Sequence, residues 1–180
     1  MSTPTHVVLV GSMGAGKTTI GTLVAGALGR DLVDNDRVLA REGANAAALA
    51  RTQGVGPLHE RECRQLRAAL AVPTPSVVAA AASTVEAPAC RAALAGHVVV
   101  WLRVDPAVAA GRLGSADDHR RDLGDDPVGA MRQLARRRDP LYAAVATVVV
   151  DAGALAPDAA ARAVVERVAH LDGVAPAAPT

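Results

Sequence analysis

Near its start the chain reads His6-Val-Val-Leu-Val-Gly-Ser-Met-Gly-Ala-Gly-Lys-Thr-Thr-Ile20. The apolar run over 6–10 is typical of a buried strand, the glycines after it favour a tight loop, and apolar spacing over 17–28 predicts a helix that Gly29 ends. A strand, a Gly-x-x-x-x-Gly-Lys-Thr loop and a helix, in that order, are the context of a phosphate-binding loop. The stretch therefore predicts an α/β fold that binds a nucleotide.

The residue types of this loop suit phosphate chemistry. Its glycines let consecutive backbone N–H groups turn toward a triphosphate, and the helix N-terminus adds positive potential. Lys17 is the only lysine among 19 basic residues; it would reach the β- and γ-phosphates and act in catalysis, while the Thr18 hydroxyl would ligate Mg²⁺. The expected ATP contacts are Gly14, Ala15, Gly16, Lys17, Thr18 and Thr19.

Two carboxylates follow the second predicted strand, over 31–34, in the sequence Asp34-Asn-Asp36. Residues at i and i+2 of an extended segment share a face. Beside a phosphate loop, one carboxylate can hold magnesium or its waters while the other accepts a proton from an incoming hydroxyl or orients it. The alternative is a solvated turn in which Asp36 caps the next helix.

Composition bounds the remaining possibilities. The 180 residues have a net charge of +1, with 21% charged and 51% apolar residues. These values argue against disorder and against a chain built to attract nucleic acid or a membrane surface. We expect a single domain over 1–172, a flexible tail over 173–180 and, without an export signal or a long apolar run, a cytoplasmic location.

The aromatic and cysteine residues point to packing rather than chemistry. Trp101 and Tyr142 are the only aromatic residues apart from histidine, and we expect them to pack in the interior. Cys63 and Cys90 are far apart in the sequence and lack metal-ligand spacing, so both are predicted to be reduced and structural.

The rest of the chain alternates between strand and helix signals. Further strands are expected over 77–82, 97–104 and 147–150, and helices over 37–50, 58–70, 88–94, 127–138 and 157–170, with another that begins at Pro106. This alternation indicates a parallel sheet covered on both faces. The polar segment 114–126 is predicted to be a mobile loop.

Four segments, in order, resemble the shikimate kinase family of small P-loop kinases. They are the glycine loop, Asp34-Asn-Asp36, the stretch from Arg91 to Leu102, and Arg138-Asp-Pro-Leu-Tyr142. The match extends over nearly the whole chain. The resemblance implies a three-layer α/β/α fold, a five-stranded parallel sheet of order 2-3-1-4-5, a lid over 114–126 that closes on ATP, and phosphoryl transfer to an alcohol.

The resemblance also implies residue roles. Asp34 stands on the magnesium side, and Asp36 hydrogen-bonds the substrate's hydroxyls and acts as base. Arg112 corresponds to the arginine that packs on adenine, and Arg138 to one that binds the substrate's carboxylate. The alternatives are a solvated Arg112 and, for 136–138, a basic last turn that offsets the helix dipole.

Departures from the family pattern fall on the acceptor side. His59 stands where the family has a second carboxylate-binding arginine, and imidazole lacks a bidentate fork. The segment Ala81-Ala82-Ser83 replaces three glycines, so Cβ atoms crowd the substrate, although Ser83 adds a hydroxyl. In the lid, Arg120 is taken as the catalytic cation; Arg121 and His119 stay open, as does a role as solvated loop charges.

The sequence thus predicts a kinase dependent on ATP and Mg²⁺ that phosphorylates a hydroxyl of a small polar metabolite. Asp36, Glu62 and Arg138 keep shikimate as a candidate, whereas His59, Ala82 and Ser83 favour a related alcohol. The alternative is an ATP-binding protein that has lost transfer and works as a switch or partner-binding module. Nucleic-acid and membrane partners are not expected, and the chain is expected to be a monomer or weak homodimer.

Overall fold

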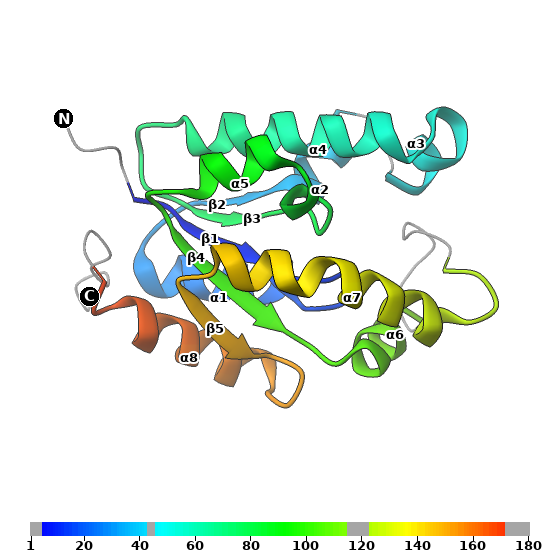
Figure 1. The fold of residues 1–180 in the computed structure, drawn as a ribbon. Coiled ribbons are helices and arrows are strands. Elements are labelled where there is room, and N and C mark those ends of the chain that lie inside the picture. Colours follow the sequence, from blue (N-terminus) through cyan, green and yellow to red (C-terminus); the bar gives the residue numbers. More distant parts are fainter. Residues whose placement is uncertain (1–4, 43–45, 115–122, 172–180) are drawn as a thin grey trace.

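The computed structural model describes residues 5–42, 46–114 and 123–171. Its parallel strands form one five-stranded sheet in the order β2-β3-β1-β4-β5, as predicted (Figure 1). The elements are β1 (Val7–Val10), α1 (Lys17–Leu28), β2 (Leu32–Asp34), α2 (Asn35–Arg41), α3 (Ala46–Gln53), α4 (Val55–Leu70), β3 (Val77–Ala79), the 3-10 turn η1 (Thr84–Glu86), α5 (Pro88–Leu94), β4 (Val98–Arg103), α6 (Pro106–Gly114), α7 (Pro127–Val145), β5 (Val148–Asp151) and α8 (Pro157–Val168).

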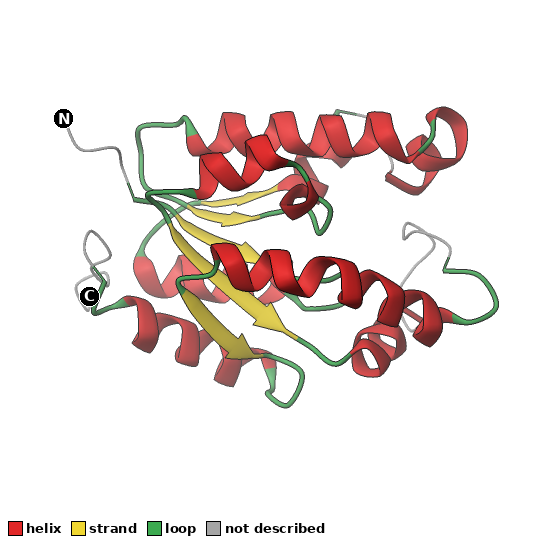
Figure 2. Cartoon of the chain, in the orientation of Figure 1, coloured by secondary structure: helices red, strands yellow, loops and turns green. Residues whose placement is uncertain are grey.

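Helices cover both faces of the sheet (Figure 2). Successive side chains of a strand point to opposite faces. Val7 and Leu9 of β1 therefore pack with α1 and α8, whereas Val8 and Val10 pack with α4, α5 and α7. Burial on both sides explains why β1 is a continuous apolar run instead of an alternating one. The predicted three-layer α/β/α architecture is confirmed.

The carboxyl ends of β1, β2 and β3 meet at one edge of the sheet. Leu9, Ala79 and Asp34 are neighbours in register across these three strands. The glycine loop follows β1, Asp34 ends β2, and the segment 80–83 follows β3. Ligands of open parallel sheets bind at this edge, so the topology gathers three of the predicted site segments in one place.

Several element boundaries differ from those predicted. The last long helix, α7, runs on to Val145 although Pro140 lies inside it, and this extension places Tyr142 in the core. Helix α4 begins at Val55, three residues early, because Gly54 takes a φ of 88° there and Pro57 fits the first helical turn. The expected helix over 37–50 consists of α2 and α3, and the strand predicted over 77–82 ends at Ala79.

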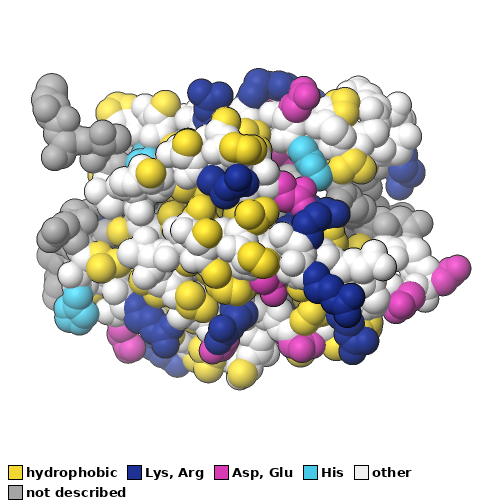
Figure 3. All heavy atoms as spheres, in the orientation of Figure 1, with side chains coloured by type: hydrophobic (Ala, Val, Ile, Leu, Met, Phe, Trp, Pro, Cys, Tyr) yellow, Lys and Arg dark blue, Asp and Glu magenta, His cyan; other side chains and the backbone are white. Residues whose placement is uncertain are grey.

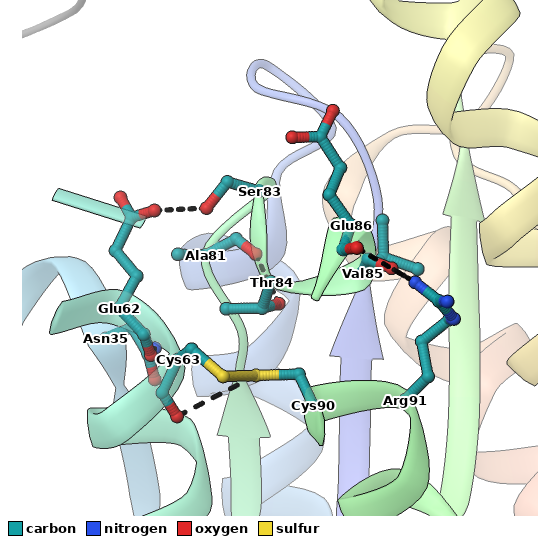
Figure 4. The surroundings of a disulfide bond; sticks show 10 residues. All are labelled: Asn35, Glu62, Cys63, Ala81, Ser83, Thr84, Val85, Glu86, Cys90 and Arg91. Carbon is teal, nitrogen blue, oxygen red and sulfur yellow. Dashed lines mark hydrogen bonds between the residues drawn. A yellow bond between two sulfur atoms is a disulfide. The ribbon is translucent and has the colours of Figure 1, made fainter. Parts of the chain in front are cut away.

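The prediction of two reduced cysteines is wrong. Cys63 of α4 and Cys90 of α5 form a disulfide, with Cα atoms 6.0 Å apart (Figure 4). The two residues are 27 positions apart, but α4 and α5 pack beside each other on the same face of the sheet. Sequence spacing alone hides this proximity, because the cysteines approach each other only once both helices are docked.

Parts of the predicted lid and all of the predicted tail lie outside the residues that the structure describes. Of the lid over 114–126, Gly114 belongs to α6 and residues 123–126 form a loop, while 115–122 lie outside the described residues, as does the whole predicted tail over 173–180. No helix in the described part of the chain is long and apolar enough to cross a membrane. The face drawn in Figure 3 carries acidic and basic side chains interspersed, without one continuous basic patch.

Candidate active site

A cavity of about 900 Å³ opens at the carboxyl edge of the sheet. It brings together nearly all the site residues that the sequence predicts within the described ranges. Those that line it are Gly14, Ala15, Gly16, Lys17, Thr18, Thr19, Asp36, His59, Glu62, Ala82, Ser83, Arg112 and Arg138. Asp34 is not among the lining residues, and the lid candidates His119, Arg120 and Arg121 lie outside the described residues.

The glycine loop adopts a conformation that requires its glycines. Gly14 and Gly16 have φ values of +74° and +86°, and a Cβ on Gly14 would lie 2.6 Å from the carbonyl oxygen of Ala109. Gly16 is also the N-cap of α1, so the first backbone N–H groups of that helix lie at the cavity. A helix N-terminus beside a glycine loop is a site for an anion such as phosphate.

Lys17 is held in the loop by backbone carbonyls. Its Nζ donates hydrogen bonds of 3.0 Å to the oxygen of Gly11 and 2.9 Å to that of Ser12. These bonds keep the ammonium next to the backbone N–H groups of the loop, and all of these groups favour negative charge. The half-buried Lys17 thus lies where an incoming phosphate oxygen can replace a carbonyl as its acceptor.

Arg112 ties the glycine loop to the loop that follows β5. Its Nη1 donates to the oxygen of Gly14 at 3.3 Å, and its Nη2 donates to the oxygen of Ala152 at 3.1 Å. The side chain also lines the cavity, together with Leu155 and Pro157. Arg112 therefore bonds to carbonyls of two loops, and its side chain forms part of the cavity wall.

The two aspartates after β2 have different surroundings. Asp34, and not Asp36, caps α2: its buried Oδ1 accepts the backbone N–H groups of Asp36 and Arg37 at 2.9 and 3.2 Å. Its buried Oδ2 has no hydrogen-bond partner among the described residues. Asp36 lies on the cavity wall. The cap explains why Asp34 is fixed, while Asp36, two residues later, is part of the cavity wall.

The residues present fit a magnesium ion. Mg²⁺ prefers oxygen ligands and usually keeps several waters. Asp34 supplies a buried carboxylate oxygen that needs a partner, and Thr18 supplies a hydroxyl on the cavity wall. Within the described ranges, no group of three or more His, Cys, Asp or Glu side chains is placed to hold a metal on its own. Such an ion would therefore need phosphate oxygens as well.

A buried carboxylate and a hydroxyl meet at the acceptor side of the cavity. Ser83 Oγ donates a hydrogen bond to Glu62 Oε2, and both side chains are buried (Figure 4). The neighbouring Ala82 carbonyl accepts a 2.7 Å hydrogen bond from the Tyr142 hydroxyl. Burial raises the pKa of Tyr142, so this group stays a neutral donor. Two hydrogen bonds thus hold the segment that follows β3, one from Ser83 to Glu62 and one from Tyr142 to Ala82.

Arg138 is paired with a carboxylate that the sequence analysis missed. Its Nε donates to Glu86 Oε1 at 3.0 Å, and the Nε of Arg137 donates to the same oxygen at 2.7 Å. His59 Nδ1 lies 3.8 Å from Glu86 Oε2. Burial alone would raise the pKa of Glu86, but hydrogen bonds and charge from Arg138 and Arg137 outweigh it and hold the pKa below its usual value.

One sequence signal points to Glu86. It is the only charged residue between Arg67 and Arg91, in a stretch of mostly small and apolar residues. A lone charge in such a stretch generally needs a partner when the segment packs. The partners come from α7, more than 50 residues away, so the sequence alone did not identify them.

Known proteins that resemble this chain in sequence or structure agree with the site described above. A profile of the family described as Shikimate kinase matches residues 13–169. Shikimate kinases of Mycobacterium tuberculosis (strain ATCC 25177 / H37Ra) and Thermobifida fusca (strain YX) are each 38% identical, and each match covers 89% of this chain and 91% and 93% of theirs. The Acinetobacter baumannii shikimate kinase, solved with shikimate, has a TM-score of 0.85 at 28% identity, covering 93% of this chain and 94% of that one.

The fold is shared more widely. A gluconokinase from Sinorhizobium meliloti 1021 has a TM-score of 0.63 at 20% identity, covering 94% of this chain and 95% of that one. At that identity the likeness concerns the fold alone. The family profile and the relatives at 38% identity are more specific. This chain therefore belongs to the shikimate kinase family and is a phosphotransferase that moves a phosphoryl group from ATP to an alcohol.

Proposed function

We propose that this phosphotransferase uses ATP with Mg²⁺ to phosphorylate a hydroxyl of a small polar metabolite, either shikimate or a related alcohol. The observation that carries the proposal is the single cavity in which the glycine loop, Asp36 and Arg138 all take part. Phosphate-binding groups occupy one part of its wall, and carboxylates with an arginine occupy another. A triphosphate and an alcohol can meet between them.

The residues divide into three roles. Lys17 and the backbone N–H groups at Gly16 neutralise the charge of the transferring phosphoryl group. Asp36 hydrogen-bonds the attacking hydroxyl and accepts its proton as the new O–P bond forms and the bond to ADP breaks. Thr18 and Asp34 would hold magnesium, which supplies charge neutralisation on the phosphates. Arg112 packs against the nucleotide, and a lid residue, Arg120 first among the candidates, adds a further cation.

The acceptor side supports an alcohol related to shikimate. His59 lines the cavity at the position of a family arginine and cannot offer two parallel N–H donors to a carboxylate. Ala82 and Ser83 carry side chains where the family has glycines, and Ser83 already donates to Glu62. These residues narrow the space and weaken a carboxylate clamp, while Asp36, Glu62 and Arg138 line the same cavity and can bind hydroxyls.

A coupled ADP-release screen tests the proposal. Purified protein with ATP and Mg²⁺ is offered shikimate, quinate, cyclitols, sugars, sugar acids and amino alcohols. We expect acceptor-dependent ADP release with at least one of them. Tight ATP binding without ADP release for any of these acceptors would contradict the proposal. It would favour a nucleotide-binding module that has lost phosphoryl transfer.

The variant Lys17→Ala provides the matching control. Removing one preorganised cation from the phosphates is expected to lower turnover by roughly 100-fold or more. The melting temperature should change little, because the two carbonyls that accept hydrogen bonds from the ammonium belong to its own loop. A fully active Lys17→Ala protein would contradict the assignment of this loop as the ATP site.

A further inference from the structure

Tyr142 hydrogen-bonds to the acceptor side of the cavity from behind its wall. Its side chain is 1% exposed and packs in the core against Trp101, and it is not among the described residues that line the cavity. Its hydroxyl nevertheless donates a 2.7 Å hydrogen bond to the carbonyl oxygen of Ala82, a residue that does line the cavity. A core side chain thus holds one backbone atom of the acceptor wall.

The carbonyl that Tyr142 binds belongs to a tight turn over 81–84, directly after β3. The backbone N–H of Thr84 donates to the Ala81 oxygen at 3.1 Å, and the Thr84 hydroxyl donates to the same oxygen at 2.7 Å (Figure 4). The peptide between Ala82 and Ser83 is the central peptide of this turn. The turn therefore fixes the two ends of that peptide, and Tyr142 fixes its orientation.

The Tyr142 hydroxyl sets the direction of an N–H group as well as that of a carbonyl. The described residues contain no cis peptide bond, and in a trans peptide the C=O and the N–H point in opposite directions. Because the Ala82 oxygen points to Tyr142, the Ser83 N–H points away from it, and Ser83 lines the cavity. Without the hydroxyl, the Ala82 oxygen would lose its partner in a segment whose neighbours are buried, which is costly.

Ser83 restricts the same peptide through its backbone conformation. Its φ of −81° and ψ of −21° match the third residue of a type I turn. Turning the central peptide over would give a type II turn, whose third residue needs a φ of about +80°. Glycine takes that value readily, whereas a residue with a Cβ does not. The shikimate kinase pattern has glycine here, so the serine removes a freedom that the pattern allows.

We propose that Tyr142 is a positioning residue for the acceptor, because it fixes the peptide between Ala82 and Ser83 with its N–H, and not its carbonyl oxygen, toward the acceptor. The Cβ of Ser83 opposes the flipped orientation and so supports the same arrangement. This inference rests on the proposed kinase function and adds to it a residue outside the cavity. Tyr142 acts through the peptide and is not itself a catalytic residue.

A double-mutant cycle tests the two contributions. Wild-type protein, Tyr142→Phe, Ser83→Gly and the double variant are assayed with ATP, Mg²⁺ and shikimate. If the wild type does not phosphorylate shikimate, the alcohol with the highest kcat/KM in the ADP-release screen takes its place. Phenylalanine keeps the ring and removes only the hydroxyl, and glycine removes the Cβ that opposes the flip.

The matched control is Ser76→Ala. Ser76 is 5% exposed, and its hydroxyl shares a 2.9 Å hydrogen bond with Nδ1 of His6. Ser76 precedes β3 and the turn over 81–84 follows it, so this change removes a buried hydrogen bond at the opposite end of the same strand. Ser76→Ala should lower the melting temperature but leave the KM for the acceptor within about twofold of wild type.

We expect Tyr142→Phe to raise the KM for the acceptor roughly threefold, while kcat and the KM for ATP stay near their wild-type values. In the double variant the peptide is free to turn over. Its KM for the acceptor should therefore exceed the product of the two single effects by roughly fivefold or more. A purely structural role for Tyr142 would reduce the amount of folded enzyme, so kcat would fall at an unchanged KM.

A measurement on the peptide itself does not depend on how the variants fold. Ala82 and Ser83 form the only Ala-Ser pair in the sequence. Protein labelled with carbonyl-13C alanine and 15N serine therefore gives a single carbonyl–amide cross-peak in a nuclear magnetic resonance spectrum. With ADP and Mg²⁺ present, addition of the same acceptor to the wild type should move the Ser83 amide proton downfield, as a new hydrogen bond forms.

Two results would overturn this proposal alone. One is a Ser83 amide signal that does not respond to the acceptor, and it counts even if Tyr142→Phe does not fold. The other is a cycle in which the two effects on the acceptor KM simply multiply, or a Ser76→Ala protein whose KM rises as much as that of Tyr142→Phe. Failure of the wild type to release ADP with any alcohol is seen before any variant is compared, and it would overturn the kinase proposal and this inference with it.

Discussion

At the scale of single residues, the two aspartates after β2 show how neighbours acquire different roles. Asp34 is buried and fixed as the N-cap of α2, whereas Asp36 lies on the cavity wall. We predict that Asp36→Asn lowers kcat by roughly 100-fold or more, since an amide cannot accept the hydroxyl proton. ATP affinity, measured by titration calorimetry, should stay within a few fold.

The matched control is Asp31→Asn. Asp31 precedes β2 at the opposite end of the strand and is exposed, so this change should leave both kcat and ATP affinity near wild-type values. An Asp36→Asn protein that loses ATP affinity as strongly as turnover would instead assign Asp36 to the magnesium side of the site.

At the scale of elements, the disulfide joins the two helical segments that flank the acceptor side. Cys63 follows Glu62 directly in α4, and Cys90 of α5 lies four residues after Glu86. A cross-link across 27 residues stabilises the fold by roughly 3 kcal/mol, because it restricts the unfolded chain. We predict that dithiothreitol lowers the melting temperature of the wild-type protein, measured by circular dichroism.

The control for this prediction is the double variant Cys63→Ser, Cys90→Ser. It should melt at the temperature of the reduced wild type and be indifferent to dithiothreitol. A wild-type melting temperature that the reductant does not change would contradict a disulfide that contributes to stability.

At the scale of the whole molecule, features set by the local sequence pattern could be predicted. Contacts that form only when helices pack on the sheet could not. The glycine loop and the helix over Lys17–Leu28 follow from apolar runs and glycine spacing, whereas the strand order was implied by the resemblance to the family. The Cys63–Cys90 bond and the pairing of Glu86 with Arg138 join segments 27 and 52 residues apart, and only the packing of helices on the sheet brings them together.

The packing of both helical layers on one sheet also predicts how the molecule unfolds. Both helical layers pack on the same five strands, and Trp101, the only tryptophan, packs against Tyr142 in one of these layers. We predict that residues 1–172 unfold as one unit. Urea transitions followed by Trp101 fluorescence, which reports on one layer, and by far-ultraviolet circular dichroism, which reports on both, should then coincide.

ATP should shift this single transition as a whole. A ligand that binds only the folded state at 100 times its Kd stabilises it by about 2.7 kcal/mol, so both probes should move together to higher urea. In Lys17→Ala the shift at the same ATP concentration should be largely lost, while the transition without ATP stays near that of wild type. Two separated transitions, or an ATP shift seen by only one probe, would contradict a single domain, because the glycine loop is connected through β1 to both helical layers.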